Sequence, residues 1–429
     1  MSNQVKLAAL AIGLAFIVQS AKAETVNKGD ILDVQVEHDL HMRVGETVRA
    51  RTVYPLYVNN ELVVPAGSEV VGKIAALRPQ SQKQRLNAKL GGDFTTLHSP
   101  QISFDRLILR DGEEIPIQTK IATGGTEVVR FQAMRASGHQ PSIVKKLWAE
   151  AIGREKETVR TYTAPGKKER ARRMLYAELP YHPELLTEGT QFEVEMAAPV
   201  QLPPVSSAPE RASADKGVDA TVTLAAELVT PISSKNAVPG TKVEAMVTEP
   251  LLNKNQEVQV PQGTILKGEI TQAHRAGKWG KGGVLRFSFR ELQFPAGFVQ
   301  KVHGAPVAVD SDQRANLEID AEGGVKPGPK GIAAPLVMGL LAASTIHEDE
   351  VTVLHTGGAS NGFALIGRVA ALAAKSNYVG AAFGFYGTGR AIYSRFIAHG
   401  QDITFPKHTR IEVVLDPERV NALRPATAK

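Results

Sequence analysis

Two stretches of this chain, 195 residues apart, repeat one pattern of turn and strand. The first is Gly45-Glu46-Thr47-Val48-Arg49-Ala50, leading to Tyr54-Pro55-Leu56, and the second is Gly240-Thr241-Lys242-Val243-Glu244-Ala245, leading to Glu249-Pro250-Leu251. Further blocks follow in the same order: Val64-Pro65-Ala66-Gly67 with Val260-Pro261-Gln262-Gly263, Gly72-x-Ile74 with Gly268-x-Ile270, and Phe104-x-x-Leu107 with Phe289-x-x-Leu292. A repeat of this length indicates duplication of a whole domain, because solenoid repeats are much shorter.

The repeated blocks have the composition of tight turns and strands. Pro-x-Gly suits a turn, because proline presets its φ angle and glycine tolerates a positive one. Later in the second copy, Leu285, Phe287 and Phe289 alternate with polar residues, and the parity then flips at Leu292 and Phe294. Ile102 and Phe104 are followed by the same flip at Leu107 and Leu109 in the first copy. A flip at equivalent places predicts a β-bulge in each copy.

Each copy also closes with a similar strand, 189–194 in the first and 408–413 in the second. The spacing between blocks places an 11-residue insertion in the first copy, around Gln80 to Leu97. We therefore predict a mainly β protein with two tandem copies of a small β-barrel or sandwich domain, each with a helical insert before its closing strand. The predicted divisions are a signal peptide at 1–23, a first domain at 24–200, a Pro/Ser/Ala linker at 201–217, a second domain at 218–420 and a tail at 421–429.

The first 23 residues have the layout of a secretory signal. Lys6 supplies the positive charge, 7–18 is an uncharged run, and Ala21-Lys22-Ala23 is a small-x-small cleavage box. An uncleaved anchor is the alternative. We expect an exported protein of the periplasm or outer envelope. Its 429 residues contain no cysteine, which excludes disulfides and thiolate metal sites. Losing Lys6 and Lys22 lowers the formal charge from +6 to +4, too little for a nucleic-acid binder.

The insert of the first copy, at about 142–179, is basic and has helical periodicity. Its densest cluster is Lys167, Lys168, Arg170, Arg172 and Arg173, and Trp148 lies on its apolar face. One interpretation is contact with an anionic lipid, a cell-wall polymer or an acidic partner. The other is a solvated helix face packed on its own barrel, which we favour.

The insert of the second copy, at about 331–397, is apolar. Residues 331–346 carry no charge, and Gly380 and Gly384 are small-residue positions that allow helices to pack closely. The pattern predicts a helical hairpin. It is interpreted either as inserting into a membrane or as a pair buried in the protein or in an oligomer. The first stretch is short for a membrane span of roughly 20 residues, which favours the second interpretation.

Few residues have a pattern typical of catalysis or metal binding. His347 to Glu350 with His355 is the densest group of metal-ligand types, and we interpret it as a polar cap on a turn. The loop Gly277-Lys278-Trp279-Gly280-Lys281-Gly282-Gly283 lacks the ending of a phosphate loop, which indicates a hairpin with an exposed Trp279. Asp105 with Arg106, and Arg290 with Glu291, are candidate ion pairs. We expect no enzyme activity, no metal and no cofactor.

The order of blocks in the second copy resembles the C-terminal barrel of TrbI-type conjugal-transfer and type IV secretion channel proteins. The residues are Val260 to Thr264, Gly268-Glu269-Ile270, Phe289-Arg290-Glu291-Leu292 and Pro295-Ala296-Gly297, within roughly 220–420. That family places an apolar helical hairpin before its last strands, as 331–397 would be here. It has one barrel after a long proline-rich arm, whereas this chain has two barrels and no arm. The resemblance implies a channel or scaffold role by analogy.

Three functions follow as hypotheses. The first is a non-enzymatic envelope scaffold or channel-associated protein, acting through contacts with itself or with other envelope proteins, with membrane contact through 331–397. The second is an extracellular module that binds an anionic lipid, a wall polymer or another ligand through the basic cluster and Trp279. The third is a hydrolase whose residues meet only in the folded protein. Trp148, Trp279, Gly380 and Gly384 are the predicted interface residues.

Overall fold

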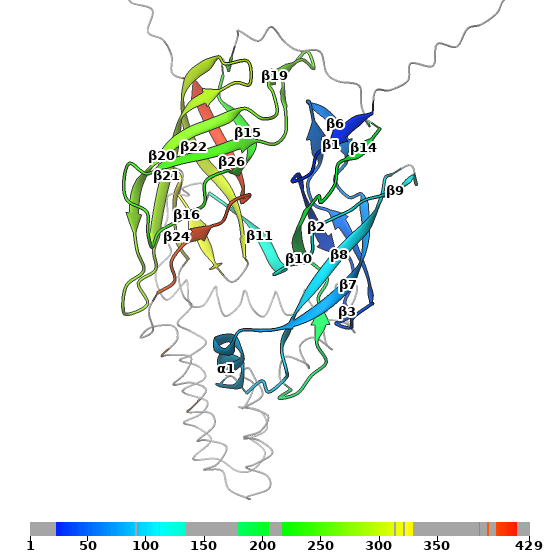
Figure 1. Ribbon diagram of the computed structural model, residues 1–429. Coiled ribbons are helices and arrows are strands. Elements are labelled where there is room, and N and C mark those ends of the chain that lie inside the picture. Colours follow the sequence, from blue (N-terminus) through cyan, green and yellow to red (C-terminus); the bar gives the residue numbers. More distant parts are fainter. Residues whose placement is uncertain are drawn as a thin grey trace, which may run out of the picture.

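The computed structural model describes residues 23–133 except 91 and 111, 179–203 and 205, 217–328 except 219, 313, 314 and 321, residues 386 and 393, and 400–417. Within these residues the protein is mainly β, with two sheet-rich halves and one helix (Figure 1). The predicted mainly β class is confirmed. Both predicted helical inserts lie almost wholly outside the described residues.

The first half contains fourteen strands and the helix. Their bounds are β1 Glu24–Val26, β2 Ile31–Val36, β3 Leu40–His41, β4 Thr47–Thr52, β5 Leu56–Val58, β6 Glu61–Val64, β7 Glu69–Pro79, α1 Gln82–Leu90, β8 His98–Ile108, β9 Glu114–Pro116, β10 Ala122–Thr123, β11 Thr126–Gln132, β12 Leu185–Leu186, β13 Thr190–Glu195 and β14 Val200–Leu202. The predicted 11-residue insertion therefore contains α1, which has no buried residue. Strand β14 includes Gln201 and Leu202 from the segment predicted as linker, and it pairs with β1.

The second half contains twelve strands. Their bounds are β15 Val222–Leu228, β16 Ile232–Ser233, β17 Lys242–Val247, β18 Leu251–Leu252, β19 Val258–Val260, β20 Ile265–His274, β21 Val284–Gln293, β22 Val299–Asp312, β23 Leu317–Ile319, β24 Gly324–Pro327, β25 Thr404–Phe405 and β26 Arg410–Pro417. Strands β26, β15, β17, β20, β21 and β22 pair in that order, and β22 returns to β26, so the sheet closes into a six-stranded barrel.

The first half repeats this order of pairing. Strands β13, β2, β4, β7 and β8 take the places of β26, β15, β17, β20 and β21. The segment 114–123 takes the sixth place, because β9 pairs with β8 and Thr119 forms a bridge with Met196 beside β13. The small hairpin of β5 with β6 likewise corresponds to that of β18 with β19. The two halves are therefore copies of one barrel topology.

The predicted bulges are present at equivalent positions. Between β7 and β8 the pairing skips Asp105, and between β20 and β21 it skips Arg290. The skipped residue reverses the facing of the strand, so residues on either side of it, such as Phe289 and Leu292, both reach the core. The bulge that the parity flip predicts is therefore confirmed in each copy.

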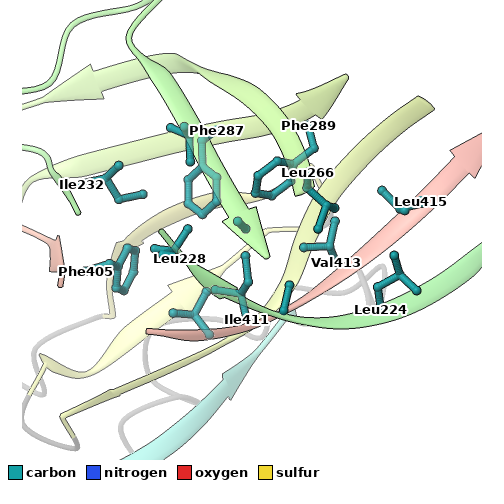
Figure 2. Packing of buried hydrophobic residues seen from close by; sticks show 14 of the residues in the cluster. Leu224, Leu228, Ile232, Leu266, Phe287, Phe289, Phe405, Ile411, Val413 and Leu415 are labelled. Atoms are coloured by element: carbon teal, nitrogen blue, oxygen red, sulfur yellow. The ribbon is translucent and has the colours of Figure 1, made fainter. Parts of the chain in front are cut away.

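Each barrel encloses its own apolar core. Figure 2 shows the second core, where the rings of Phe287 and Phe289 meet edge to face with their centroids 5.9 Å apart, among aliphatic side chains of β15, β20 and β26. Phe131 in β11 of the first half and Ala133, directly after that strand, also pack against this second core. One strand of the first copy therefore packs against the second barrel.

Candidate functional site

Strand β11 joins the two barrels. Its first two residues, Thr126 and Glu127, pair with β13 of the first barrel. Its next five, from Val128 to Gln132, pair antiparallel with the end of β22, with Arg130 opposite Asp310. Because of this strand the two barrels share one 16-stranded sheet (Figure 1). We call β11, the end of β22 and the charged side chains around them the junction.

Arg130 is the central side chain of the junction. Its Nε lies 2.9 Å from Asp310 Oδ1, and its Nη1 lies 2.5 Å from Glu412 Oε1. Its Nη2 also donates to the hydroxyl of Tyr54, over 3.2 Å. The Asp310 side chain is only 7% exposed. The hydrogen bond to this carboxylate raises the pKa of Arg130, so the guanidinium keeps its charge in spite of burial.

Tyr54 connects the first barrel to the same carboxylate. Its hydroxyl donates to Asp310, which adds a second donor to the buried acid. Its ring lies under the guanidinium of Arg410, 4.6 Å from centroid to Cζ, a geometry suited to a cation–π contact. Burial, together with the bond to Asp310, raises the pKa of Tyr54 well above its ordinary value. The phenol therefore stays protonated and keeps donating.

Arg410 and Asp33 form a second ion pair across the junction. Arg410 Nε, from β26, lies 3.2 Å from Asp33 Oδ2, from β2, and the two side chains are 12% and 14% exposed. Burial raises the pKa of Asp33, while Arg410 opposes this effect. A charge pair with this little solvent is costly to break from one side, because the remaining charge is then buried alone.

Further carboxylates surround these pairs. Oε1 of Glu227, on β15, lies 3.4 Å from Nδ1 of His408. Glu193, on β13, also interacts electrostatically with His408. Burial raises the pKa of Glu193 and also that of Glu249. Among the described residues the junction thus holds two arginines and one histidine against an excess of carboxylates: Asp33, Glu193, Glu227, Glu249, Asp310 and Glu412.

A second contact lies away from the charges. The backbone N–H of Gln262, in the turn before β20, donates to Asn60 Oδ1 over 2.7 Å. The Gln262 side chain donates to the carbonyl of Tyr57 over 2.6 Å. The β5–β6 hairpin of the first copy is thereby tied to the Pro-x-Gly turn of the second. The two barrels are held at two separate places, which resists rotation about β11.

The two inserts return to the barrels at equivalent places. In the first copy, Pro180 accepts a hydrogen bond from Phe94 N, in the β7–β8 connection, over 2.8 Å. In the second copy, Gly400 N donates to Gly277 O, in the β20–β21 connection, over 2.9 Å. Tyr386, within the second insert, donates to the Leu90 carbonyl at the end of α1 over 3.2 Å. The tips of both long hairpins therefore lie at the end of the molecule where the inserts return.

Most of the predicted site residues lie outside the described residues. These are Trp148, Lys167, Lys168, Arg170, Arg172, Arg173, Gly380, Gly384 and the group from His347 to His355. Trp279 is described, and its side chain is 73% exposed at the tip of the β20–β21 hairpin, as predicted.

The two candidate ion pairs at the bulges had different outcomes. Arg106 Nε lies 3.5 Å from Asp105 Oδ1, which confirms the first pair. Arg290 instead lies 2.8 Å from Glu269 on β20, so the pair with Glu291 was wrong. Glu269 lies on the strand that neighbours Arg290 and supplies the closer carboxylate.

The junction residues were not found from the sequence. Arg130 and Asp310 are 180 residues apart, and each is an ordinary polar residue on the outward face of a strand. The one available signal was Tyr54, which stands in a repeated block where the second copy has Glu249. A change of residue type inside a matched block indicates that the two copies differ in their contacts at that position.

Little in the described part of the chain suggests another kind of site. It contains no group of three His, Asp or Glu residues arranged to hold a metal ion. A cavity of about 320 Å³ lies beside β2 and β4, where Glu37, Arg51 and Glu188 contribute to its lining. None of the helices in this part is both long and apolar enough to span a bilayer.

No protein-family model matches the chain, and neither does any curated protein. Among solved structures, the chain is similar to the structure titled ComB10 of the Com type IV secretion system of Helicobacter pylori, with 11% identity. The alignment covers 43% of this chain and 93% of that one, with a TM-score of 0.22. A superposition this loose supports no statement about function, and the resemblance to TrbI-type proteins stays a prediction.

Proposed function

We propose that this protein is a non-enzymatic scaffold of the cell envelope whose two barrels act as one rigid body. The observation that carries the proposal is the junction, where β11 extends the sheet of the first barrel into the second and Arg130 bridges Asp310 and Glu412. Two tandem domains joined only by a linker are expected to move relative to each other. A shared sheet with buried ion pairs removes that freedom.

A rigid junction would fix the position of one insert relative to the other, because each barrel carries one insert. Both inserts return at the hairpin tips of the barrels, through Pro180 and Gly400. A fixed junction therefore holds the bases of the two inserts at a constant separation. The basic insert of one copy and the apolar insert of the other would be presented together to other envelope components. The resemblance of 220–420 to TrbI-type proteins makes a channel-associated scaffold the more specific form of this proposal.

Cell fractionation tests the envelope part of the proposal. When the full chain is expressed, we expect the processed protein to begin at Glu24 and to appear in the envelope or periplasm, where amine cross-linking captures its assemblies. Carbonate and high-salt extraction of the same fractions separates inserted from peripheral protein. A protein that keeps residues 1–23 and remains in the cytoplasm would contradict the export. A strictly monomeric protein without cross-linked partners would contradict the scaffold.

A further inference from the structure

The tip of the β20–β21 hairpin is an unusual tight turn. Trp279 and Gly280 both have positive φ angles, 62° and 66°, and Lys281 N donates to Lys278 O over 3.4 Å. Gly277 N also donates to Lys281 O, over 2.8 Å. Two successive positive φ angles define a type I′ turn, whose first central residue is usually Asn, Asp or Gly.

Trp279 is therefore in a backbone conformation that a bulky residue seldom adopts. The turn of the β5–β6 hairpin has residues that usually adopt positive φ angles, since Asn59 and Asn60 have φ angles of 52° and 70°. Packing does not explain the tryptophan either, because 73% of it is exposed. A strained residue without a packing role points to a contact outside the molecule.

The residues around Trp279 indicate the chemistry of that contact. Arg275, Lys278 and Lys281 are all exposed, and residues 275–283 contain no acidic side chain. Tryptophan favours the polar–apolar boundary of a bilayer, and lysine and arginine favour anionic headgroups. The aromatic ring and the three cations together therefore fit the surface of an anionic lipid bilayer.

The turn is held firmly beside the second insert. Asp402 Oδ1 accepts from Ala276 N over 2.7 Å, and Gly283 N donates to Gln401 O over 2.9 Å. With the bond from Gly400 to Gly277, these contacts fix both ends of the loop to residues 400–402. That segment directly follows the stretch 331–397, whose sequence is the most apolar of the mature chain. The tip thus lies next to the return point of the apolar insert.

We propose that the turn at residues 277–281 is an interfacial anchor, which places Trp279 in the headgroup region of an anionic lipid bilayer. The exposed cations attract the surface, and the tryptophan ring then enters the interface. The strained turn keeps the ring exposed before contact. The anchor does not depend on the scaffold proposal, because it concerns one loop and one surface.

The chain provides its own probe, since it contains only two tryptophans. In Trp148→Phe, all tryptophan fluorescence comes from Trp279. The full chain is mixed with vesicles of phosphatidylcholine alone or with about 30% phosphatidylglycerol. We expect a blue shift of the emission, and quenching by brominated lipid, with the anionic vesicles. Lys278→Gln with Lys281→Gln should lower vesicle affinity by about 10–30-fold, from about 1 kcal/mol for each cation.

Trp279→Asn separates lipid contact from folding. Asparagine suits a type I′ turn, so this variant should melt at the same or a higher temperature and lose at least tenfold in vesicle affinity. If Trp148→Phe fails to fold, Trp279→Cys labelled with an environment-sensitive dye replaces it, because no other cysteine competes. Unchanged emission or dye signal would overturn the proposal, whether or not the protein cosediments with vesicles. A lower melting temperature of Trp279→Asn would also overturn it, as would binding to isolated cell wall but not to vesicles.

Discussion

At the scale of single residues, the junction depends most on Arg130. It donates to Asp310, Glu412 and Tyr54, which come from three separate segments of the chain. Removing it would leave Asp310, 7% exposed, without its main counter-charge. The cost should lie between the roughly 1 kcal/mol of an exposed pair and the roughly 3–5 kcal/mol of a buried one, since Arg130 itself is partly exposed.

We therefore expect Arg130→Ala to lower the free energy of unfolding by about 2–3 kcal/mol in urea denaturation. The matched control is Arg290→Ala, which removes an arginine paired with Glu269 but 64% exposed. This control should change stability by less than about 1 kcal/mol. If both variants lowered the free energy of unfolding equally, the ion pairs of Arg130 would contribute no more to stability than an exposed pair does.

The carboxylates of the junction predict how its stability depends on pH. Burial raises the pKa of Asp33, Glu193 and Glu249, so the folded protein keeps these protons to a higher pH than the unfolded chain does. Their stabilising contribution is complete below the unfolded pKa, near 4, and is lost as the pH rises through the raised values. Asp320, whose pKa is lowered by hydrogen bonds despite burial, acts in the opposite direction.

The test compares wild type with Glu193→Gln by urea unfolding from pH 4 to pH 8. A glutamine cannot ionise, so the variant should lose less stability than wild type as the pH rises. Asp105→Asn, at an exposed bulge position, serves as the control and should follow the wild-type profile. An unchanged profile for Glu193→Gln would mean that Glu193 does not contribute to the pH dependence.

Residue-level prediction succeeded where the information was local. The parity flip around Asp105 and Arg290 located both bulges, because alternation along a strand reports directly on side-chain facing. The partners of Arg130 could not be predicted, because they depend on how the two barrels approach each other. The sequence of a strand does not indicate which strand of the other barrel its outward side chains will contact.

At the scale of elements, the long hairpins explain a repeated motif. In both copies the glycine of Gly-x-Ile lies on β7 or β20, at the point where the partner strand has its bulge. A Cβ on Gly72 would lie 2.4 Å from the carbonyl oxygen of Ser103, and on Gly268 it would lie 2.1 Å from that of Ser288. The partner backbone thus excludes any side chain at both positions. The duplication has kept a glycine at each of them.

We expect Gly72→Ala and Gly268→Ala each to destabilise the protein by about 1–3 kcal/mol or more, because the strand must shift to accept the methyl group. Gly277→Ala is the control, since its Cβ would lie 3.5 Å from the nearest side-chain atom. The midpoint of urea unfolding measures all three. If the two strand glycines tolerate alanine as well as Gly277 does, the close approach is not what requires glycine.

The elements themselves were partly predictable. Pro-x-Gly turns and alternating strands were visible in the sequence, and so was the length of the insertion between β7 and β8. Its helical content was not predicted, because α1 buries no residue and so has no apolar periodicity to detect. Strand β11 was missed for a similar reason. It is mostly exposed, and its pairing partner belongs to the other copy.

At the scale of the whole molecule, duplication produced two barrels that are equal in topology and unequal in their connections. The segment after β10 extends outward as β11 to reach the second barrel. Its counterpart after β22 instead forms β23, which pairs with β24 at the side of its own barrel. The sequence predicted the two copies, but not this difference, because both segments are short and neither indicates which strand it will pair with. Through this difference, the two tandem domains share one sheet.

The most direct test of this account measures the distance between the barrels. Thr47 and Lys242 begin the equivalent strands β4 and β17, and both are exposed. The chain otherwise lacks cysteine, so spin labels can be attached to both positions of the double variant Thr47→Cys with Lys242→Cys. Pulsed electron paramagnetic resonance then measures the distance between the two labels. We predict a single narrow distance distribution that broadens in Arg130→Ala. A broad distribution in the protein with Arg130 intact would contradict the rigid junction.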